Sequence, residues 1–224
     1  MDNAAEYPIF SMALPPTQPQ VRLVLVDTCS LVRLYYSDLK PVAGRTVASK
    51  HILTLDRLAK EVVGLAKSDE YAWLNVERLA EVNASVHKLT QAKEISIDAR
   101  RKRDQSNWQI ALDAHCQATA CGLRKLSIND GFALAAVIEF EAILVTDEWP
   151  LKWVAENFDY DNGTPIESLL SVDILALYEA NGVIDAGDRR KTYHSWRAFG
   201  ESLHKNSDKQ YRAHFGEAPP NAQS

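Results

Sequence analysis

Two apolar segments of the chain each end on an acid, and this pattern is the first sign of possible chemistry. Asp27 follows the segment "LVLV", and Asp147 follows "AILVT". A carboxylate at the edge of an apolar core is costly unless a partner compensates its charge. Each acid therefore either caps the helix that comes after it or holds a metal ion.

Two further acids stand where they could join the first two. Asp130, in "INDGFALAAV", begins a predicted helix with small residues on its inner face. Glu61, in "LAKEVVG", lies between Leu58 and Leu65 on one face of a predicted helix, so it borders the buried side. Taken alone, Asp130 could be only a helix cap and Glu61 only a solvated acid. The nearby competitors of Glu61 are Asp56, Glu70 and Glu77.

Four carboxylates that converge can all stay ionised only when cations lie between them. Mg²⁺ and Mn²⁺ prefer such oxygen ligands. A pair of these ions activates water and stabilises both oxygens of an in-line phosphoryl displacement. The pattern therefore predicts a Mg²⁺ or Mn²⁺ site. Its catalytic and metal-binding residues would be Asp27, Glu61, Asp130 and Asp147.

The predicted elements would bring these acids together. Strands are predicted over 21–27, 51–55 and 142–147, and helices over 28–39, 56–67, 70–89, 107–123, 128–140 and 148–158. A polar, basic break is predicted at 98–105, and the helix over 107–123 should end at Gly122. This order predicts an α/β chain with a parallel sheet, in which ligands bind beyond the carboxyl ends of the strands.

Charge and cysteine content set limits on the function. The 224-residue chain has a net charge of −5, so any contact with nucleic acid should depend on local basic patches. Its three cysteines form no CxxC pair, and no secretory signal begins the sequence, which indicates a cytoplasmic location. His115, Cys116 and Cys121 lack a fourth ligand for zinc.

One basic run could contact RNA phosphates. It consists of Arg100, Arg101, Lys102 and Arg103. Charge runs are more often simply solvated, so this site is a hypothesis. Motifs of other folds are absent from the sequence: it contains neither GxGxxG nor GxxxxGK[ST], which argues against a dinucleotide fold and a P-loop.

Three segments resemble the signature stretches of the PIN-domain nucleases, in the same order. They are "VDTCSLVRL", "INDGFALAAV" and "ILVTDEWPL". The resemblance covers roughly residues 21–158 and implies a three-layer α/β/α fold with a central, mostly parallel sheet. It also implies a metal-dependent ribonuclease, which in VapC-like members is the toxin of a toxin–antitoxin pair. Polar residues that orient the carboxylates or water would be Thr28, Ser30, Asn129, Thr146 and Glu148.

The resemblance leaves the partners and the ends of the chain more open. RNA would be the substrate, and an antitoxin, another protein or a second copy of the chain would be the partner. Around a nuclease domain at 21–158 we expect an irregular arm at 1–20, a helical extension at 159–204 and a flexible tail at 205–224. The alternative function is a non-catalytic PIN-like module that binds RNA or a protein.

Overall fold

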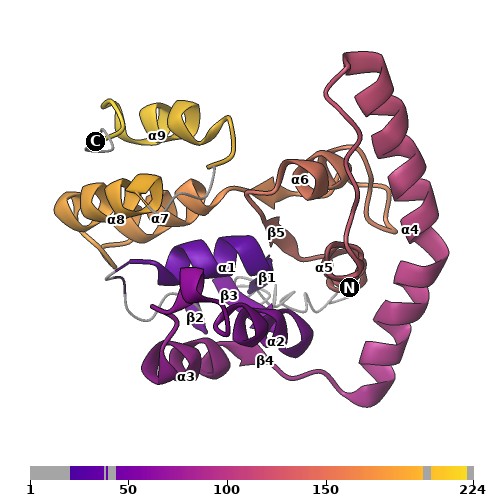
Figure 1. Ribbon diagram of the computed structural model, residues 1–224, viewed down its shortest axis with the longest axis horizontal. Coiled ribbons are helices and arrows are strands. Elements are labelled where there is room, and N and C mark those ends of the chain that lie inside the picture. The colour runs from indigo at the N-terminus through magenta and orange to yellow at the C-terminus, as the bar shows by residue number, and fades with distance from the viewer. Residues whose placement is uncertain (1–20, 38, 40–43, 199–202, 221–224) are drawn as a thin grey trace, which may run out of the picture.

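The computed structural model describes residues 21–37, 39, 44–198 and 203–220, so the predicted arm and residues 221–224 lie outside the described residues. Within these ranges, six strands form one sheet in the order β2-β3-β1-β5-β6, with β4 also paired to β3 (Figure 1). Only β2 runs antiparallel to its described neighbour; the other pairs are parallel. The prediction of an α/β chain with a mostly parallel sheet is confirmed.

The strands and helices alternate along most of the chain. The strands are β1 Arg22–Val26, β2 Arg45–Val47, β3 Lys50–Leu55, β4 Val86–His87, β5 Ile143–Val145 and β6 Ser168–Leu169. The helices are α1 Thr28–Tyr35, α2 Asp56–Leu65, α3 Val76–Ala84, α4 Gln91–Thr119, α5 Ile128–Phe140, α6 Trp149–Glu156, α7 Ser171–Ala180, α8 Ala186–Ala198 and α9 Ser207–Phe215. A short 3-10 turn spans Asp69–Tyr71.

Apolar residues on both faces of the sheet are buried by helices. Along β1, Val24 and Val26 belong to a core shared with α1, α7 and α8, whereas Leu25 belongs to a second core with α4, α5 and α6. This division follows from the alternation of side chains along a strand. The arrangement is compatible with a three-layer α/β/α fold.

The helix α4 corrects one prediction. The sequence at 98–105 was expected to interrupt the helix, but these residues lie in the middle of one 29-residue helix. Neither Gly nor Pro occurs within it, and acids three or four positions from the basic residues pair with them, as Asp98 does with Lys102. Figure 1 shows α4 standing along one side of the molecule.

Two other helix predictions are wrong in their extent. The helix expected at 70–89 is confined to α3, because the Asn75 side chain caps it by accepting from the Arg78 N–H. The helix expected to end at Gly122 ends earlier, because Ala120 already adopts the left-handed conformation with φ 51°.

The C-terminal part is more ordered than the sequence indicated. The expected flexible tail contains α9, whose Tyr211 is fully buried in the core. The residues that follow 158 also continue the sheet, since β6 pairs with β5. Val172 of α7 lies in the same core as Val24 of β1. The predicted extension is therefore built onto the sheet. None of the helices in the described ranges is long and apolar enough to cross a membrane.

Candidate functional site

The neighbouring strands β1 and β5 bring two predicted acids to one edge of the sheet. Val26 is paired with Val145 in this parallel ladder, so Asp27 and Thr146 are the next residues on the two strands. The Asp27 N–H donates to the Val145 carbonyl at 3.1 Å. Residues 119 positions apart in sequence therefore meet at the carboxyl ends of the strands, where ligands of parallel sheets bind.

Asp27 is both a helix cap and a buried acid. Its Oδ1 accepts the Ser30 N–H at 2.8 Å, and its Oδ2 accepts the Thr146 hydroxyl at 2.5 Å. Only 4% of the residue is exposed. Burial, followed by repulsion from Glu148, raises the pKa of Asp27 from 3.8 to about 8, although hydrogen bonds from Thr146 and Ser30 oppose the rise. Without a nearby cation, Asp27 therefore keeps its proton at neutral pH.

Asp147 lies at the same edge, but its carboxylate is occupied by hydrogen-bond donors. The Arg33 guanidinium and the Ser171 hydroxyl donate to Oδ2. The Ser171 N–H donates to Oδ1 at 3.3 Å, and the Ser30 hydroxyl lies 3.4 Å from Oδ2. Ser30 also accepts the Asp147 N–H at 3.0 Å. Asp147 is thus joined to Asp27 through Ser30, while its carboxylate faces α1 and α7.

Glu148 is the acid that acts most strongly on Asp27. It precedes α6, and its N–H donates to the Thr146 hydroxyl oxygen at 3.1 Å. The Cys29 thiol donates to its Oε1 at 2.7 Å. The sequence indicated Glu148 only as an orienting residue. It contains two adjacent acids, Asp147 and Glu148, and does not reveal which of them faces the neighbouring strand β1.

Glu61 and Asp130 form a second group of acids. The Thr28 hydroxyl donates to Glu61 Oε2 at 2.7 Å, and Thr28 directly follows Asp27. Burial raises the pKa of Asp130, and the charge of Glu61 acts in the same direction. The two acids are therefore close enough to interact. Among the competitors of Glu61, Asp56 pairs with Lys60, and Glu70 and Glu77 are exposed.

Asp130 also fills the structural role that the sequence left open. Its Oδ2 accepts the Ser127 N–H at 2.6 Å, and its own N–H donates to the Ser127 hydroxyl oxygen at 3.0 Å. This reciprocal pair is a capping box at the start of α5. The neighbouring Asn129 accepts from Arg57 Nε at 3.1 Å, and Arg57 lies over the Phe132 ring.

The four predicted acids and Glu148 do not form one compact ligand cluster. Across the described residues, no group of three His, Cys, Asp or Glu side chains is placed to hold a metal ion. Mg²⁺, however, is commonly bound through one or two carboxylates, with water in its other positions. In ligand type, Asp27 with Glu148 and Glu61 with Asp130 fit this pattern.

A cavity of about 410 Å³ opens beside Asp147 and Glu148. Its walls come from α1, the start of α6 and the segment before α9. The lining residues are Cys29, Arg33, Asp147, Glu148, Trp149, Pro150, Leu203, His204 and Lys205. Lys205 Nζ lies 5.9 Å from the centre of the Trp149 ring. The sequence gave no sign of His204 or Lys205, because they lie beyond the segments with recognisable motifs.

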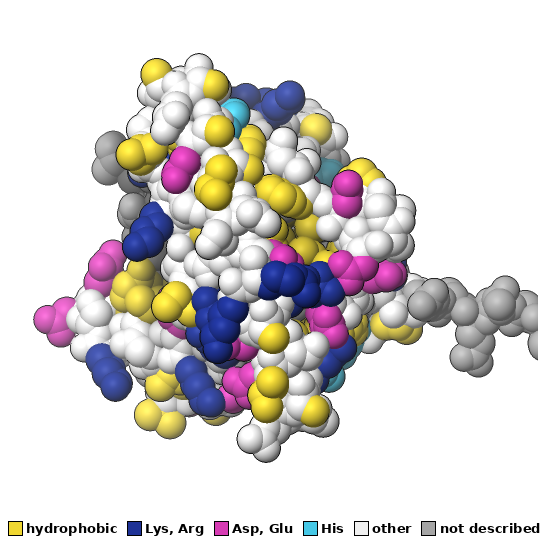
Figure 2. Space-filling model, turned by 90° about the vertical axis from the view of Figure 1, so that its right-hand side faces the viewer, with side chains coloured by type: hydrophobic (Ala, Val, Ile, Leu, Met, Phe, Trp, Pro, Cys, Tyr) yellow, Lys and Arg dark blue, Asp and Glu magenta, His cyan; other side chains and the backbone are white. Residues whose placement is uncertain are grey.

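The basic run on α4 is engaged in ion pairs. Arg100 pairs with Glu139 and Asp161, and Arg103 pairs with Asp104. Arg101 and Lys102 both pair with Asp98. On the side of the molecule where α4 lies, basic and acidic side chains stand next to one another (Figure 2). An RNA phosphate would therefore have to compete with these acids.

Comparison with known proteins adds no assignment. No family model matches the chain, and neither a curated protein nor a solved structure matches it.

Proposed function

We propose that this chain is a PIN-like, Mg²⁺- or Mn²⁺-dependent endoribonuclease. The observation that supports the proposal best is Asp27. It is buried at the carboxyl end of a central strand, and the charge that acts on it most strongly is another acid, Glu148. Burying like charges together is unfavourable unless a cation compensates them. Such an arrangement suits a metal site better than a structural one.

Each of two pairs of acids would bind one metal ion. Asp27 and Glu148 would hold one ion, and Glu61 and Asp130 would hold the other. A bound ion would supply an activated water and stabilise charge on the phosphodiester. Thr146 and Ser30 orient Asp27, and Thr28 orients Glu61. Asp147 belongs to the predicted ligand set, and its contacts with Arg33 and Ser171 favour a role in fixing α1 and α7 beside the acids.

The cavity beside Glu148 would receive part of the RNA. Lys205 offers a charge for a phosphate, and Trp149 offers a ring on which a base can stack. The PIN resemblance also suggests a toxin role with an antitoxin as partner, dimerisation and a cytoplasmic location. These are parts of the same proposal.

The second candidate is a non-catalytic module that binds RNA or protein. The observation in its favour is that no three potential metal ligands converge among the residues that the structure describes. Metal binding separates the two candidates. A module of this kind would bind RNA equally well in Mn²⁺ and in EDTA.

The test is an RNA cleavage assay with Mn²⁺, using wild-type protein, Asp27→Asn and Glu77→Gln. Glu77 is a matched control, because it is an exposed acid on α3. We expect Asp27→Asn to lose about 100-fold or more in rate and Glu77→Gln to keep the wild-type rate. A DNA strand of the same sequence shows the preference between the two nucleic acids.

Two results would contradict the proposal. One is full cleavage by a correctly folded Asp27→Asn variant, and the other is full cleavage in excess EDTA. RNA binding without cleavage, unchanged by Mn²⁺, would favour the non-catalytic module.

A further inference from the structure

Two cysteines meet at the end of the long helix α4. Cys116 lies on its last turn and is only 2% exposed, whereas Cys121 lies just beyond the helix and is exposed. Between them, Ala120 adopts the left-handed conformation, and the Cys121 N–H donates to the Cys116 carbonyl at 3.2 Å. This is the backbone bond of the Schellman motif, which a contact between the side chains of these two positions frequently accompanies.

The two thiols shift each other's pKa and differ in character. The Cys121 thiol itself donates to the Gly122 carbonyl at 3.7 Å. Hydrogen bonding with Thr119, and then with Cys116, lowers the pKa of Cys121. Burial, followed by the contact with Cys121, raises the pKa of Cys116. An exposed thiol that ionises readily thus lies against a buried thiol that does not. Reactive thiols with a resolving partner share this arrangement.

The loop that carries Cys121 is already held against α4. The Gln109 side chain donates to the Arg124 carbonyl at 2.7 Å and accepts the Leu126 N–H at 2.9 Å. The backbone bond between Cys121 and Cys116 holds the start of the same loop. A bond between the two sulfurs would therefore join segments that are in contact before it forms.

We propose that Cys116 and Cys121 are a reversible dithiol–disulfide pair that reacts with hydroperoxides. The Cys121 thiolate attacks the peroxide, the O–O bond breaks, and the alcohol leaves with a proton, giving a sulfenic acid. The Cys116 thiol then attacks the Cys121 sulfur, and the S–O bond breaks as the S–S bond forms. The leaving hydroxide takes the thiol proton and departs as water. In a reducing compartment such a pair is transient and serves as a sensor.

The third cysteine provides an internal comparison. The Cys29 thiol donates to the Glu148 carboxylate at 2.7 Å. Cys29 lies on α1, so the proposed pair forms without it, and it should stay reduced while the pair on α4 is oxidised.

The test treats the full chain with a small excess of hydrogen peroxide, alkylates the remaining thiols and digests it with trypsin without reductant. Both cysteines fall in the peptide 104–124, which has no internal Lys or Arg. We expect this peptide to lack alkylation and to be lighter by two hydrogen atoms, with Cys29 alkylated. Dithiothreitol should restore both thiols. A peptide 104–124 with both cysteines alkylated, or with oxygen added to Cys121 as the main product, would overturn the proposal.

Single variants test the order of the two steps. Cys116→Ser should accumulate a sulfenic acid on Cys121, which dimedone traps, and Cys121→Ser should slow the oxidation of Cys116 about tenfold or more. Cys29→Ser should leave the oxidation of the pair unchanged. Oxidation of Cys116 in Cys121→Ser at the wild-type rate would refute the assignment. These readouts are independent of RNA cleavage.

Discussion

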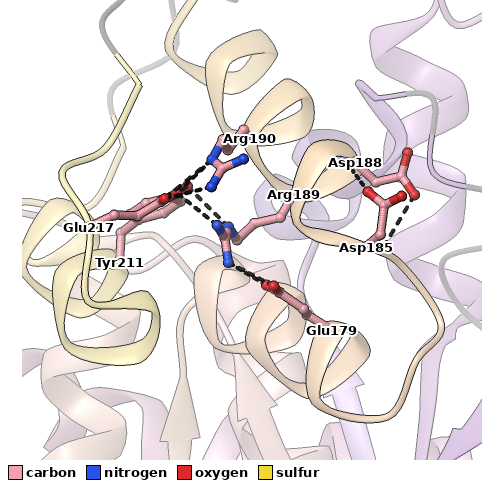
Figure 3. A network of polar contacts seen from close by, with 7 residues as sticks. All are labelled: Glu179, Asp185, Asp188, Arg189, Arg190, Tyr211 and Glu217. Carbon is pink, nitrogen blue, oxygen red and sulfur yellow. Dashed lines mark hydrogen bonds and ion pairs between the residues drawn. The ribbon is translucent and has the colours of Figure 1, made fainter.

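Charged side chains are concentrated in two regions of the molecule, and the pKa values of one acid in each are shifted in opposite directions. We call the first the acid edge; its members are Asp27, Glu61, Asp130 and Glu148. The second, the C-terminal network, joins α7, α8 and the end of α9 (Figure 3). In it, Arg189 lies between Glu179 and Glu217, and Arg190 reaches the other side of Glu217.

The direction of the pKa shifts separates the two regions. Hydrogen bonding with Arg190 lowers the pKa of Glu217 to about 2, whereas burial raises the pKa of Asp27 to about 8. In the network, each acid faces a base within the protein. At the acid edge, the acids act on one another. The acids of the network are therefore compensated by arginines, whereas burial and another acid raise the pKa of Asp27, and this difference supports the proposed cation site.

The largest effect should come from breaking the C-terminal network at its centre. Arg189 is 4% exposed, binds Glu179 through two contacts and lies 4.2 Å from the centre of the Phe215 ring. We expect Arg189→Ala to lower the free energy of unfolding by about 2–4 kcal/mol, measured by urea denaturation. This is less than for a fully buried pair, because Glu179 and Glu217 keep some contact with water.

The neighbouring Arg190 is the matched control, since it pairs with the same Glu217 but is exposed. Arg190→Ala should lose far less stability, because exposed ion pairs contribute little. Equal losses for the two variants would show that burial does not distinguish them.

A smaller effect should appear when the acid edge is neutralised. In the folded state, Asp27 holds a proton that the unfolded chain releases, so the unfolding free energy of metal-free protein should fall as the pH rises from about 4 to about 8. At pH 8 in EDTA, we expect Asp27→Asn to be more stable than wild type by about 1–3 kcal/mol.

Mn²⁺ should reverse this order. It should raise the melting temperature of the wild type more than that of Asp27→Asn, because the variant keeps Glu61 and Asp130 but lacks the Asp27 charge that one ion would compensate. If Asp27→Asn is less stable than wild type in EDTA at pH 8, that result contradicts this account of the acid edge.

The C-terminal network should respond to pH in the opposite sense. The pKa of Glu217 is depressed, so its contribution is present above pH 4.5 and is lost as the pH falls toward about 2. The difference in melting temperature between wild type and Glu217→Gln should therefore be smaller at pH 3 than at pH 6. Thermal melts at the two pH values measure it, and an equal difference at both would argue against the pairing of Glu217 with the arginines.

The smallest effect should come from the basic run on α4. Lys102 and Arg103 are exposed and paired with Asp98 and Asp104. We expect replacing both with Ala to leave the unfolding free energy nearly unchanged. If the run contacts RNA, the variant also binds RNA more weakly and with less dependence on salt. Lys209→Ala on α9 is the control. Equal RNA binding by the wild type, the double variant and Lys209→Ala would exclude the basic run from the RNA interface.

The sequence predicted the acid edge where the signal was local. Apolar runs that end on acids located Asp27 of the acid edge and Asp147 beside it, and the periodic apolar face selected Glu61. What it could not show was the direction of each carboxylate. The partners of Asp147 are Arg33 on α1 and Ser171 on α7. These contacts depend on the packing of distant segments, which no local pattern encodes.

The errors in the helices have physical causes of the same kind. The basic run in α4 resembles a break because its like charges repel one another, but acids three or four positions away pair with them and support a helix there. The helix α9 was missed because its short sequence is mostly polar. Its position is fixed by contacts such as Arg189 with Tyr211 and Glu217.

The strand order also has a consequence for synthesis of the protein. Asp27 directly follows β1, a strand made early, while Thr146, its hydrogen-bond partner, follows 119 residues later. At about 5–20 residues per second, a ribosome needs on the order of ten seconds to cover that distance. During this interval β1 lacks its neighbour β5, so the emerging chain cannot assemble the acid edge. Under the proposed function, a nascent or truncated chain that ends before β5 should therefore not cleave RNA.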